Sequence, residues 1–491
     1  MAHWEIQGWM ILILGWVFVP FYSRSMVYTM PEFLERRYNP QSRTILSVIS
    51  LVSYVLTKVA VTVYAGGLVF QQVFGIKELW GIDFFWIAAI GLVVLTALYT
   101  IFGGMKSVLY TSVLQTPILL LGSLIILVLG FKELGGWDEM MRVCGAVTVN
   151  DYGDTMTNLI RSNDDANFPW LGALIGSAII GFWYWCTDQF IVQRVLSGKN
   201  EKEARRGTIF GAYLKLLPVF LFLIPGMIAF ALHQKYIGAG GEGFLPMLAN
   251  GTANADAAFP TLVAKLLPAG VKGLVVCGIL AALMSSLASL FNSSAMLFTI
   301  DFYKRFRPET PEKKLVGIGQ IATVVIVILG ILWIPIMRSV GDVLYTYLQD
   351  VQSVLAPGIA AAFLLGICWK RTSAQGGMWG LIAGMIIGLT RLGAKVYYSN
   401  AGEVADSTFK YLFYDMNWLF FCGWMFLFCI IVVIVVSLAT EAPTAEKIQG
   451  LVFGTATKEQ KAATRASWDH WDIIHTVIIL AITGAFYWYF W

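Results

Sequence analysis

Twelve apolar stretches alternate with polar connections along the chain. An α-helix needs about 20 mostly apolar residues to cross the hydrocarbon core of a bilayer, and nearly all of these stretches approach or exceed that length. Residues 376–390 are short and must take length from their flanks. The pattern therefore predicts about twelve helical spans, which are residues 6–22, 44–74, 80–102, 107–131, 168–196, 207–233, 273–300, 315–337, 343–369, 376–390, 418–438 and 473–491.

The composition agrees with this pattern. Of the 491 residues, 58% are hydrophobic and only 13% are charged, and the mean hydropathy is +0.70. These values are not those of a water-soluble chain, and they indicate an all-α, polytopic helical membrane protein whose surroundings are a lipid bilayer. The net charge is +4 and no dense basic run occurs, so nucleic acid is not an expected partner.

Motifs for covalent chemistry are missing from the sequence. The six cysteines are scattered without a CxxC pair, which argues against a metal cluster or a disulfide framework. The sequence has no HExxH, GxSxG or P-loop motif. We therefore do not expect an enzyme.

The positive charges predict a topology. Together with the adjoining span ends, the odd-numbered connections hold 21 of the 34 Lys and Arg residues and the even-numbered ones hold 11. By the positive-inside rule the odd connections are cytoplasmic, so both termini lie outside the cell (inner or plasma) membrane. Residues 132–167 and 234–272 then form long outward connections, and the polar residues 439–470 form an inward tether before the last span.

A row of hydroxyls marks the seventh span. In VCGILAALMSSLASLFNSSAMLFTID, Ser286, Ser289 and Ser293 recur at helical spacing with Ala282, so one helix face is small and rich in oxygen. Such a face allows close helix packing in a membrane. It also suits sodium, because adjacent hydroxyls such as those of Ser285 and Ser286, with backbone carbonyls, offer several oxygens to a hard cation. Position alone leaves both interpretations open.

Ionisable side chains inside spans are costly and suggest function. Glu5, in HWEIQGW, is either an interfacial carboxylate or part of a site. Lys215, in AYLKLLPVFLFLIPG, either extends toward the cytoplasmic headgroups or donates to a polar solute. Lys58, in SYVLTKVAVTVY, has the same ambiguity with less support, and we interpret it as structural.

The fifth span ends in GFWYWCTDQFIVQR, where Trp183, Tyr184 and Trp185 precede Asp188 and Gln189. Aromatic rings beside amide and carboxylate groups suit a pyranose, which has apolar faces and a polar rim. An aromatic belt at the membrane interface would explain the rings but not the polar cluster that follows them.

The ninth span contains LYTYLQDVQSVLAPG, with Tyr345, Gln349 and Asp350 ahead of Pro357 and Gly358. This composition bends or breaks a helix. In transporters, broken helices near the midplane hold solute and ion sites.

Several long motifs together resemble the sodium/solute symporter family, and most closely its sodium/glucose cotransporter branch. They are GWVFVPFYSRSMVYTMPEFLERRY, WYWCTDQFIVQRVLSGKN, AYLKLLPVFLFLIPGMI, AALMSSLASLFNSSAMLFTIDFYK and AAFLLGICWKRTSAQGGMWGLIAGMIIG. The resemblance implies a five-plus-five inverted-repeat core in residues 1–369, with nine spans, followed by peripheral spans in residues 370–491. It also implies secondary active transport, in which inward sodium movement drives uptake of a hexose by alternating access.

The resemblance assigns roles to individual residues. Glu5, Lys215 and Gln349 match the side chains of the family that bind sugar hydroxyls. Tyr184 matches the inner aromatic gate, Trp185 its neighbouring ring, and Tyr345 the outer aromatic lid.

For the co-transported sodium ion, Ser285 and Ser286 match the hydroxyl ligands, and Ala282 matches a carbonyl ligand one turn earlier.

Two departures from the family pattern change these expectations. Relatives have two further helices before the segment that contains Glu5, and the second of them is a broken helix that completes the sodium site. We therefore expect this chain to be short by about two helices and to lack the first core helix. Ser112, in VLYTSVLQT, stands where relatives commonly have an aspartate tied to a second sodium, so we expect one sodium per cycle.

Two other functions remain open at the level of sequence. A symporter of the same fold could carry another solute, such as an inositol, proline or sialic acid. A sugar-gated sensor would bind sugar without concentrating it.

Overall fold

The structure is a computed structural model that describes residues 2–248, 251–340, 343–401 and 405–490. Residues 249–250 of the second predicted outward connection thus lie outside the described residues. Helices dominate the described residues, and consecutive helical segments join into stretches long enough to be membrane spans. The α-helices are α1 (Ala2–Glu5), α2 (Gly8–Ile13), α3 (Val19–Ser25), α4 (Met30–Arg37), α5 (Pro40–Ser53), α6 (Ala60–Phe74), α7 (Phe84–Leu134), α8 (Trp137–Gly145), α9 (Trp170–Gly181), α10 (Gln189–Leu196), α11 (Glu201–Pro218), α12 (Ile224–Gly238), α13 (Ala258–Leu266), α14 (Ala269–Met296), α15 (Lys304–Phe306), α16 (Glu312–Val340), α17 (Leu344–Cys368), α18 (Ala374–Asn400), α19 (Thr408–Lys410), α20 (Trp418–Ala439), α21 (Ala445–Ile448), α22 (Lys458–Ala466) and α23 (His470–Tyr489).

Short π-helical segments interrupt several spans, and a two-stranded hairpin precedes α7. A π-helical turn widens the helix locally and often marks a functional site. These further elements are the π-helical segments η1 (Leu14–Phe18), η2 (Tyr54–Val59), η3 (Phe182–Thr187), η4 (Val219–Leu223), η6 (Leu297–Tyr303) and η7 (Tyr411–Asp415), the 3-10 helix η5 (Ala255–Ala257), and the strands β1 (Glu78–Leu79) and β2 (Ile82–Asp83).

The prediction of about twelve spans is confirmed. Among the described residues, 11 helices are long and apolar enough to cross a membrane, and Phe84–Leu98 is a shorter apolar helix that matches the remaining predicted span. The tenth span, predicted at residues 376–390, is longer in the structure, where α18 runs for 27 residues. Its additional residues include charged side chains, which hid its true end from the apolar pattern.

The third and fourth predicted spans lie in one continuous helix, so the predicted break between residues 102 and 107 is wrong. Helix α7 has 51 residues, which corresponds to a length of about 77 Å at 1.5 Å per residue. A bilayer core is only about 30 Å thick, and the two apolar windows, Phe84–Leu98 and Ser112–Leu134, are separate within this helix. Gly103 and Gly104 lower helix propensity without removing a backbone donor, so they do not end the helix.

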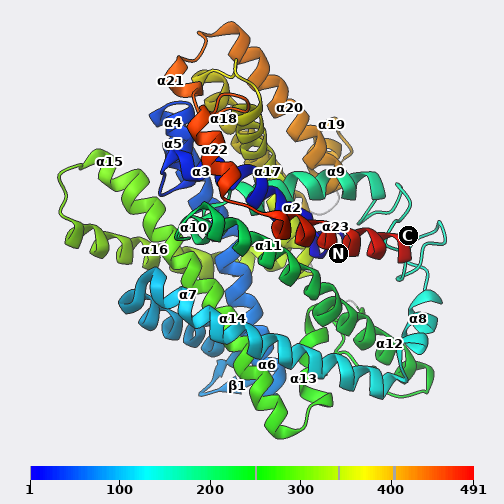
Figure 1. The fold of residues 1–491 in the computed structure, drawn as a ribbon. Helices are drawn as coiled ribbons and strands as arrows, with labels where there is room; N and C mark the ends of the chain where they lie inside the picture. The colour runs from blue at the N-terminus through cyan, green and yellow to red at the C-terminus, as the bar shows by residue number, and fades with distance from the viewer. Residues whose placement is uncertain (1, 249–250, 341–342, 402–404, 491) are drawn as a thin grey trace.

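Helix α17 is the most enclosed of these spans, with 83% of its apolar window buried. It packs against α18, α20 and α9, which surround it in the upper half of Figure 1. Helices α6, α7 and α14 pack together in the lower half. Between these two groups lie α2, α10 and α11 (Figure 1). Helix α11 carries Lys215, α2 follows the helix that ends at Glu5, and α10 follows the segment that contains Tyr184 and Trp185.

The two connections predicted to face outward contain short helices, α8 in the first and α13 in the second. The second connection also caps α17, because the carboxylate of Asp256 accepts hydrogen bonds from the Leu344 backbone N–H at 3.1 and 3.2 Å. Burial raises the pKa of Asp256, while the bond from Leu344 acts in the opposite direction.

The two ends of the described chain lie side by side, and α23 runs along α2 and α11 (Figure 1). The His3 Nδ1 atom is 3.1 Å from the Tyr487 hydroxyl. The tether predicted at residues 439–470 is docked on the rest of the chain, since Lys447 donates to the Glu35 carbonyl at 2.8 Å and Arg24 donates to the Thr464 hydroxyl at 2.7 Å.

Candidate functional site

An ion pair joins Glu5 and Lys215, which are 210 residues apart in sequence. Glu5 is the last residue of α1, immediately before the break that separates α1 from α2, and Lys215 lies in α11 one turn before η4. The Lys215 Nζ atom is 2.8 Å from Glu5 Oε2, and the two side chains are 14% and 25% exposed, respectively. Lys215 therefore reaches a carboxylate inside the protein, which favours a role in a site over an orientation toward the headgroups.

Two adjacent rings cover this pair. Tyr184 and Trp185 lie in η3, with ring centroids 5.1 Å apart in an edge-to-face arrangement. The Lys215 Nζ atom lies 5.4 Å from the centroid of the Trp185 ring, within the range of a cation–π contact. Tyr184 is also close enough to Glu5 to interact with its charge.

Helix α17 contributes Tyr345 and Gln349, which lie one turn apart on the same face. The Tyr345 side chain is close to both Glu5 and Gln349. Its hydroxyl and the Gln349 Oε1 atom are buried, and neither meets the geometry of a hydrogen bond to any described residue. A buried polar atom without a partner costs about 1–3 kcal/mol. These two atoms are therefore suited to a ligand that supplies hydroxyl groups.

The structure thus brings all six predicted substrate-site residues together in one cluster: Glu5, Tyr184, Trp185, Lys215, Tyr345 and Gln349.

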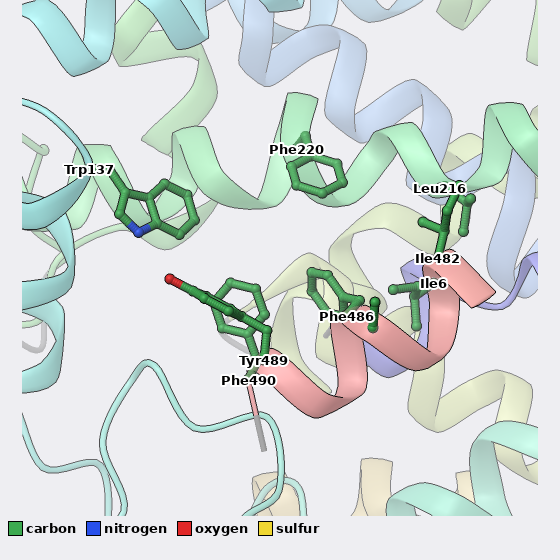
Figure 2. A pocket seen from close by; sticks show the side chains of 9 residues that line it. Ile6, Trp137, Leu216, Phe220, Ile482, Phe486, Tyr489 and Phe490 are labelled. Atoms are coloured by element: carbon green, nitrogen blue, oxygen red, sulfur yellow. The ribbon is translucent and has the colours of Figure 1, made fainter. Parts of the chain in front are cut away.

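Figure 2 shows the apolar lining of a separate cavity, which has a volume of about 390 Å³. Ile6 and Leu216, the sequence neighbours of Glu5 and Lys215, face it together with Phe486 of α23. Its described lining is apolar and includes none of the six site residues. The cavity is therefore not the candidate site for a polar solute.

The predicted sodium ligands lie on α14. Ser286 is exposed, while Ala282 and Ser285 are partly buried. The Ser285 hydroxyl is 2.6 Å from the hydroxyl of Ser112 in α7. Ser112, the position where the family resemblance leads us to expect an aspartate, therefore directly contacts one of the predicted ligands.

The other serines of the same stripe pack against α10. Ser289 and Ser293 are fully buried. The Gln193 Nε2 atom donates to the Ser293 hydroxyl at 2.6 Å, and Arg194 donates to the Ser289 hydroxyl. The helix-packing interpretation thus holds for Ser289 and Ser293, whereas Ser285 and Ser286 lie outside this contact.

Sequence reasoning missed one buried ion pair. Lys58, which we interpreted as structural, pairs with Asp188, and their side chains are 9% and 2% exposed, respectively. Opposite charges in two apolar spans are a sign of such a pair, because each charge needs a partner in lipid. The sequence showed both charges but could not show that they meet.

A model of the sodium:solute symporter family matches residues 2–384. The chain is 36% identical to the sodium/mannose cotransporter SLC5A10 of Bos taurus, over 98% of this chain and 83% of the relative. It is 35% identical to the sodium/myo-inositol cotransporter 2 of Homo sapiens, over 92% and 68% of the two chains, respectively. It is 37% identical to the sodium/glucose cotransporter 1 of Ovis aries, over 88% and 67%.

Among solved structures, the chain is similar to a Na⁺-coupled sialic acid symporter in a substrate-bound, outward-open state. The TM-score is 0.67 at 20% sequence identity, covering 90% of this chain and 84% of the other. The likeness confirms the predicted class, an all-α integral membrane protein with the fold of sodium-coupled symporters.

The chain belongs to the sodium:solute symporter family. Sodium is accordingly its co-transported ion.

Proposed function

We propose that this protein couples inward sodium movement to uptake of a hexose by alternating access. The observation that supports this proposal most is the cluster of Glu5, Lys215, Tyr345 and Gln349 beside the Trp185 ring. Relatives named for mannose, myo-inositol and glucose transport agree with a polyhydroxylated solute.

The charges of the cluster favour a neutral solute. Glu5 and Lys215 neutralise each other at 2.8 Å, so neither leaves an uncompensated charge for a carboxylate or an amine. A sugar hydroxyl both donates and accepts, and it can therefore accept from Lys215 while another hydroxyl donates to Glu5. The Trp185 ring offers a flat surface to an apolar sugar face. This arrangement suits a sugar better than sialic acid or proline, which carry charge.

For the ion, the proposed ligands are the hydroxyls of Ser285 and Ser286 and the carbonyl of Ala282. Ser112 brings a neutral hydroxyl to Ser285, not a carboxylate. A second monovalent cation would find no negative side chain there to balance its charge, so we propose one sodium per sugar.

One sodium supplies enough energy for accumulation. A membrane potential of roughly 100 mV contributes about 2.3 kcal/mol per charge. A tenfold sodium gradient adds about 1.4 kcal/mol. Together they support a sugar gradient of about several hundredfold.

In the proposed cycle, sodium binding favours the outward-open form, in which sugar enters the cluster. Tyr345 then closes above the sugar from α17. Displacement of Tyr184 on η3 later opens the path inward. The positive-inside pattern would place both chain termini outside the cell membrane during this cycle.

The direct test uses purified protein in sealed vesicles with an inward sodium gradient. We expect labelled glucose, galactose or mannose to accumulate with sodium outside and not with potassium or choline. Equal loading in all three salts would overturn the proposal.

Transport of myo-inositol is the second candidate, because a relative that is 35% identical is named for it. Competition of labelled glucose uptake by unlabelled myo-inositol, proline and sialic acid separates these solutes. A sugar-evoked current without accumulation of label would instead indicate a sensor.

A further inference from the structure

Asp188 lies at a break in the fifth span. It separates the π-helical segment η3 from α10 and has an extended backbone, with φ −78° and ψ 128°. Its Oδ1 atom accepts a hydrogen bond from the Phe190 N–H at 3.0 Å and so caps α10. The half that precedes the break carries Tyr184, and the half that follows it carries Gln193 and Arg194. Asp188 is therefore positioned as a hinge between two functional segments.

The second span holds this hinge through two side chains of η2. Tyr54 donates from its hydroxyl to Asp188 Oδ1 at 2.8 Å, and Lys58 donates to Asp188 Oδ2. The Tyr54 hydroxyl also accepts from the Phe190 N–H at 3.0 Å. Lys58 and Tyr54 therefore fix the carboxylate and the start of α10 at the same time.

The Lys58 ammonium is also in contact with the ring at the predicted inner gate. Its Nζ atom lies 5.0 Å from the centroid of Tyr184 and 4.3 Å from that of Phe190. The rings of Tyr54 and Trp183 lie 4.7 and 5.9 Å from the same atom. A buried cation needs such partners because water is excluded. Lys58 thus contacts rings on both sides of the break.

The half of the span after the break is attached to α14, the helix of the proposed sodium ligands. Gln193 donates to the Ser293 hydroxyl at 2.6 Å and to the Ser289 carbonyl at 3.2 Å. Arg194 donates to the Ser289 hydroxyl. The gate ring and α14 are therefore linked through Asp188.

We propose that Lys58 and Asp188 are positioning residues that clamp the hinge and hold Tyr184 in the closed arrangement until α14 shifts on sodium binding. The proposal rests on the proposed function for its assignment of Tyr184 as the inner gate. In this role the pair sets the coupling between sodium and sugar and touches neither of them. Release of the clamp would allow sodium to cross without sugar.

If the pair had only a structural role, removing both charges would leave the coupling between sodium and sugar unchanged. Removing one partner leaves an uncompensated buried charge, whereas replacing both with neutral groups is often tolerated. The main variant is therefore Lys58→Met/Asp188→Asn, in which Asn keeps the capping oxygen for α10. A milder variant, Tyr54→Phe, removes one hydrogen bond to Asp188 and keeps both charges. The matched control is Lys410→Met/Asp406→Asn, which removes an exposed Lys–Asp pair.

Cys186 provides a measurement that is independent of transport. It is fully buried in η3, two residues before Asp188. Purified protein is treated with a maleimide, and mass spectrometry assigns the label to each cysteine. Cys277 and Cys368 are exposed and Cys422 is buried, so they serve as internal standards for reactivity and for intact folding.

In the double variant we expect labelling of Cys186 to become about tenfold faster, equivalent to about 1.4 kcal/mol of easier opening, with Cys422 still protected. In vesicles, the sodium leak without sugar rises and sugar accumulation per molecule falls. Tyr54→Phe shifts both readouts in the same direction by a smaller factor, and the control pair shifts neither.

Wild-type labelling of Cys186 and wild-type coupling in the folded double variant would overturn the clamp. If the double variant does not fold, Tyr54→Phe decides the question by the same two readouts. Failure of the wild-type protein to accumulate sugar would overturn the proposed function, and the Cys186 labelling would still test the clamp.

Discussion

Replacement of Lys215 by alanine is expected to weaken sugar binding while sodium activation changes little. Lys215 donates to Glu5 at 2.8 Å and faces the Trp185 ring, whereas the proposed sodium ligands lie on α14. The substitution removes a charged donor from the cluster and leaves Glu5 without its cation. Its effect should therefore appear in the concentration of sugar needed for half-maximal uptake.

The structure sets the size of this effect. A hydrogen bond to a charged group contributes about 1.5–3 kcal/mol, which corresponds to an increase of about 10- to 150-fold in that sugar concentration. The two side chains of the pair are only 14% and 25% exposed, so removing Lys215 alone also lowers the stability of the fold by leaving the Glu5 carboxylate without its cation. Sugar affinity is therefore compared on folded protein.

The assay measures initial rates of labelled sugar uptake in vesicles over a range of sugar and sodium concentrations. Lys235→Ala is the matched control, because Lys235 lies in the same span, Glu201–Gly238, and donates to the Leu134 carbonyl away from the cluster. A double variant, Glu5→Gln/Lys215→Met, separates two explanations. If Glu5 and Lys215 only neutralise each other and do not bind sugar, the double variant regains wild-type sugar affinity, and our assignment is wrong. If both side chains bind hydroxyls, the double variant stays impaired.

Three further substitutions test the site. Ser286→Ala should raise the sodium concentration for half-maximal transport about tenfold, for a loss of about 1.4 kcal/mol, and an unchanged sodium dependence would count against this ligand. Tyr345→Phe should weaken sugar binding by about 1 kcal/mol, because it removes one hydroxyl from the cluster, and unchanged uptake would contradict this. Ser112→Asp should raise the ratio of charge to sugar from one toward two, measured as current against labelled uptake, and a constant ratio would argue against Ser112 as the determinant of stoichiometry.

The spans could be predicted from sequence because the bilayer imposes one strong, local requirement, an apolar length. The prediction at residues 418–438 corresponds to Trp418–Ala439 in the structure. The same criterion of apolar length placed the end of α18 too early, because Arg391 and Lys395 interrupt the apolar pattern. In the structure, Arg391 donates to the Leu412 and Met416 carbonyls, and Lys395 pairs with Asp350. Such distant partners make a charge tolerable inside a span, and sequence does not show them.

The candidate site shows the same limit. The six cluster residues could be named because their motifs resemble those of a family. The Lys58–Asp188 pair could not be found in this way, because its partners are 130 residues apart and neither stands in a recognisable pair motif. Local pattern supplied the identities of the ionisable residues, but the fold determines which of them meet.

The cluster lies where two spans are interrupted, and this coincidence has a physical cause. A break frees backbone N–H and C=O groups that lipid cannot satisfy, so polar side chains must gather around it. At the break after Glu5, the Gln7 Nε2 atom donates to the Ser177 carbonyl of α9 at 3.0 Å. Gly181 allows this approach, since a Cβ there would lie 2.5 Å from Gln7 Oε1.

The first break is therefore packed directly on the helix that leads into the second, at Asp188. A sugar bound between Glu5 and Tyr184 would contact the flank of each break. Rearrangement of either break would then change the shape of the site, which is the mechanical requirement for binding a solute on one side of a membrane and releasing it on the other.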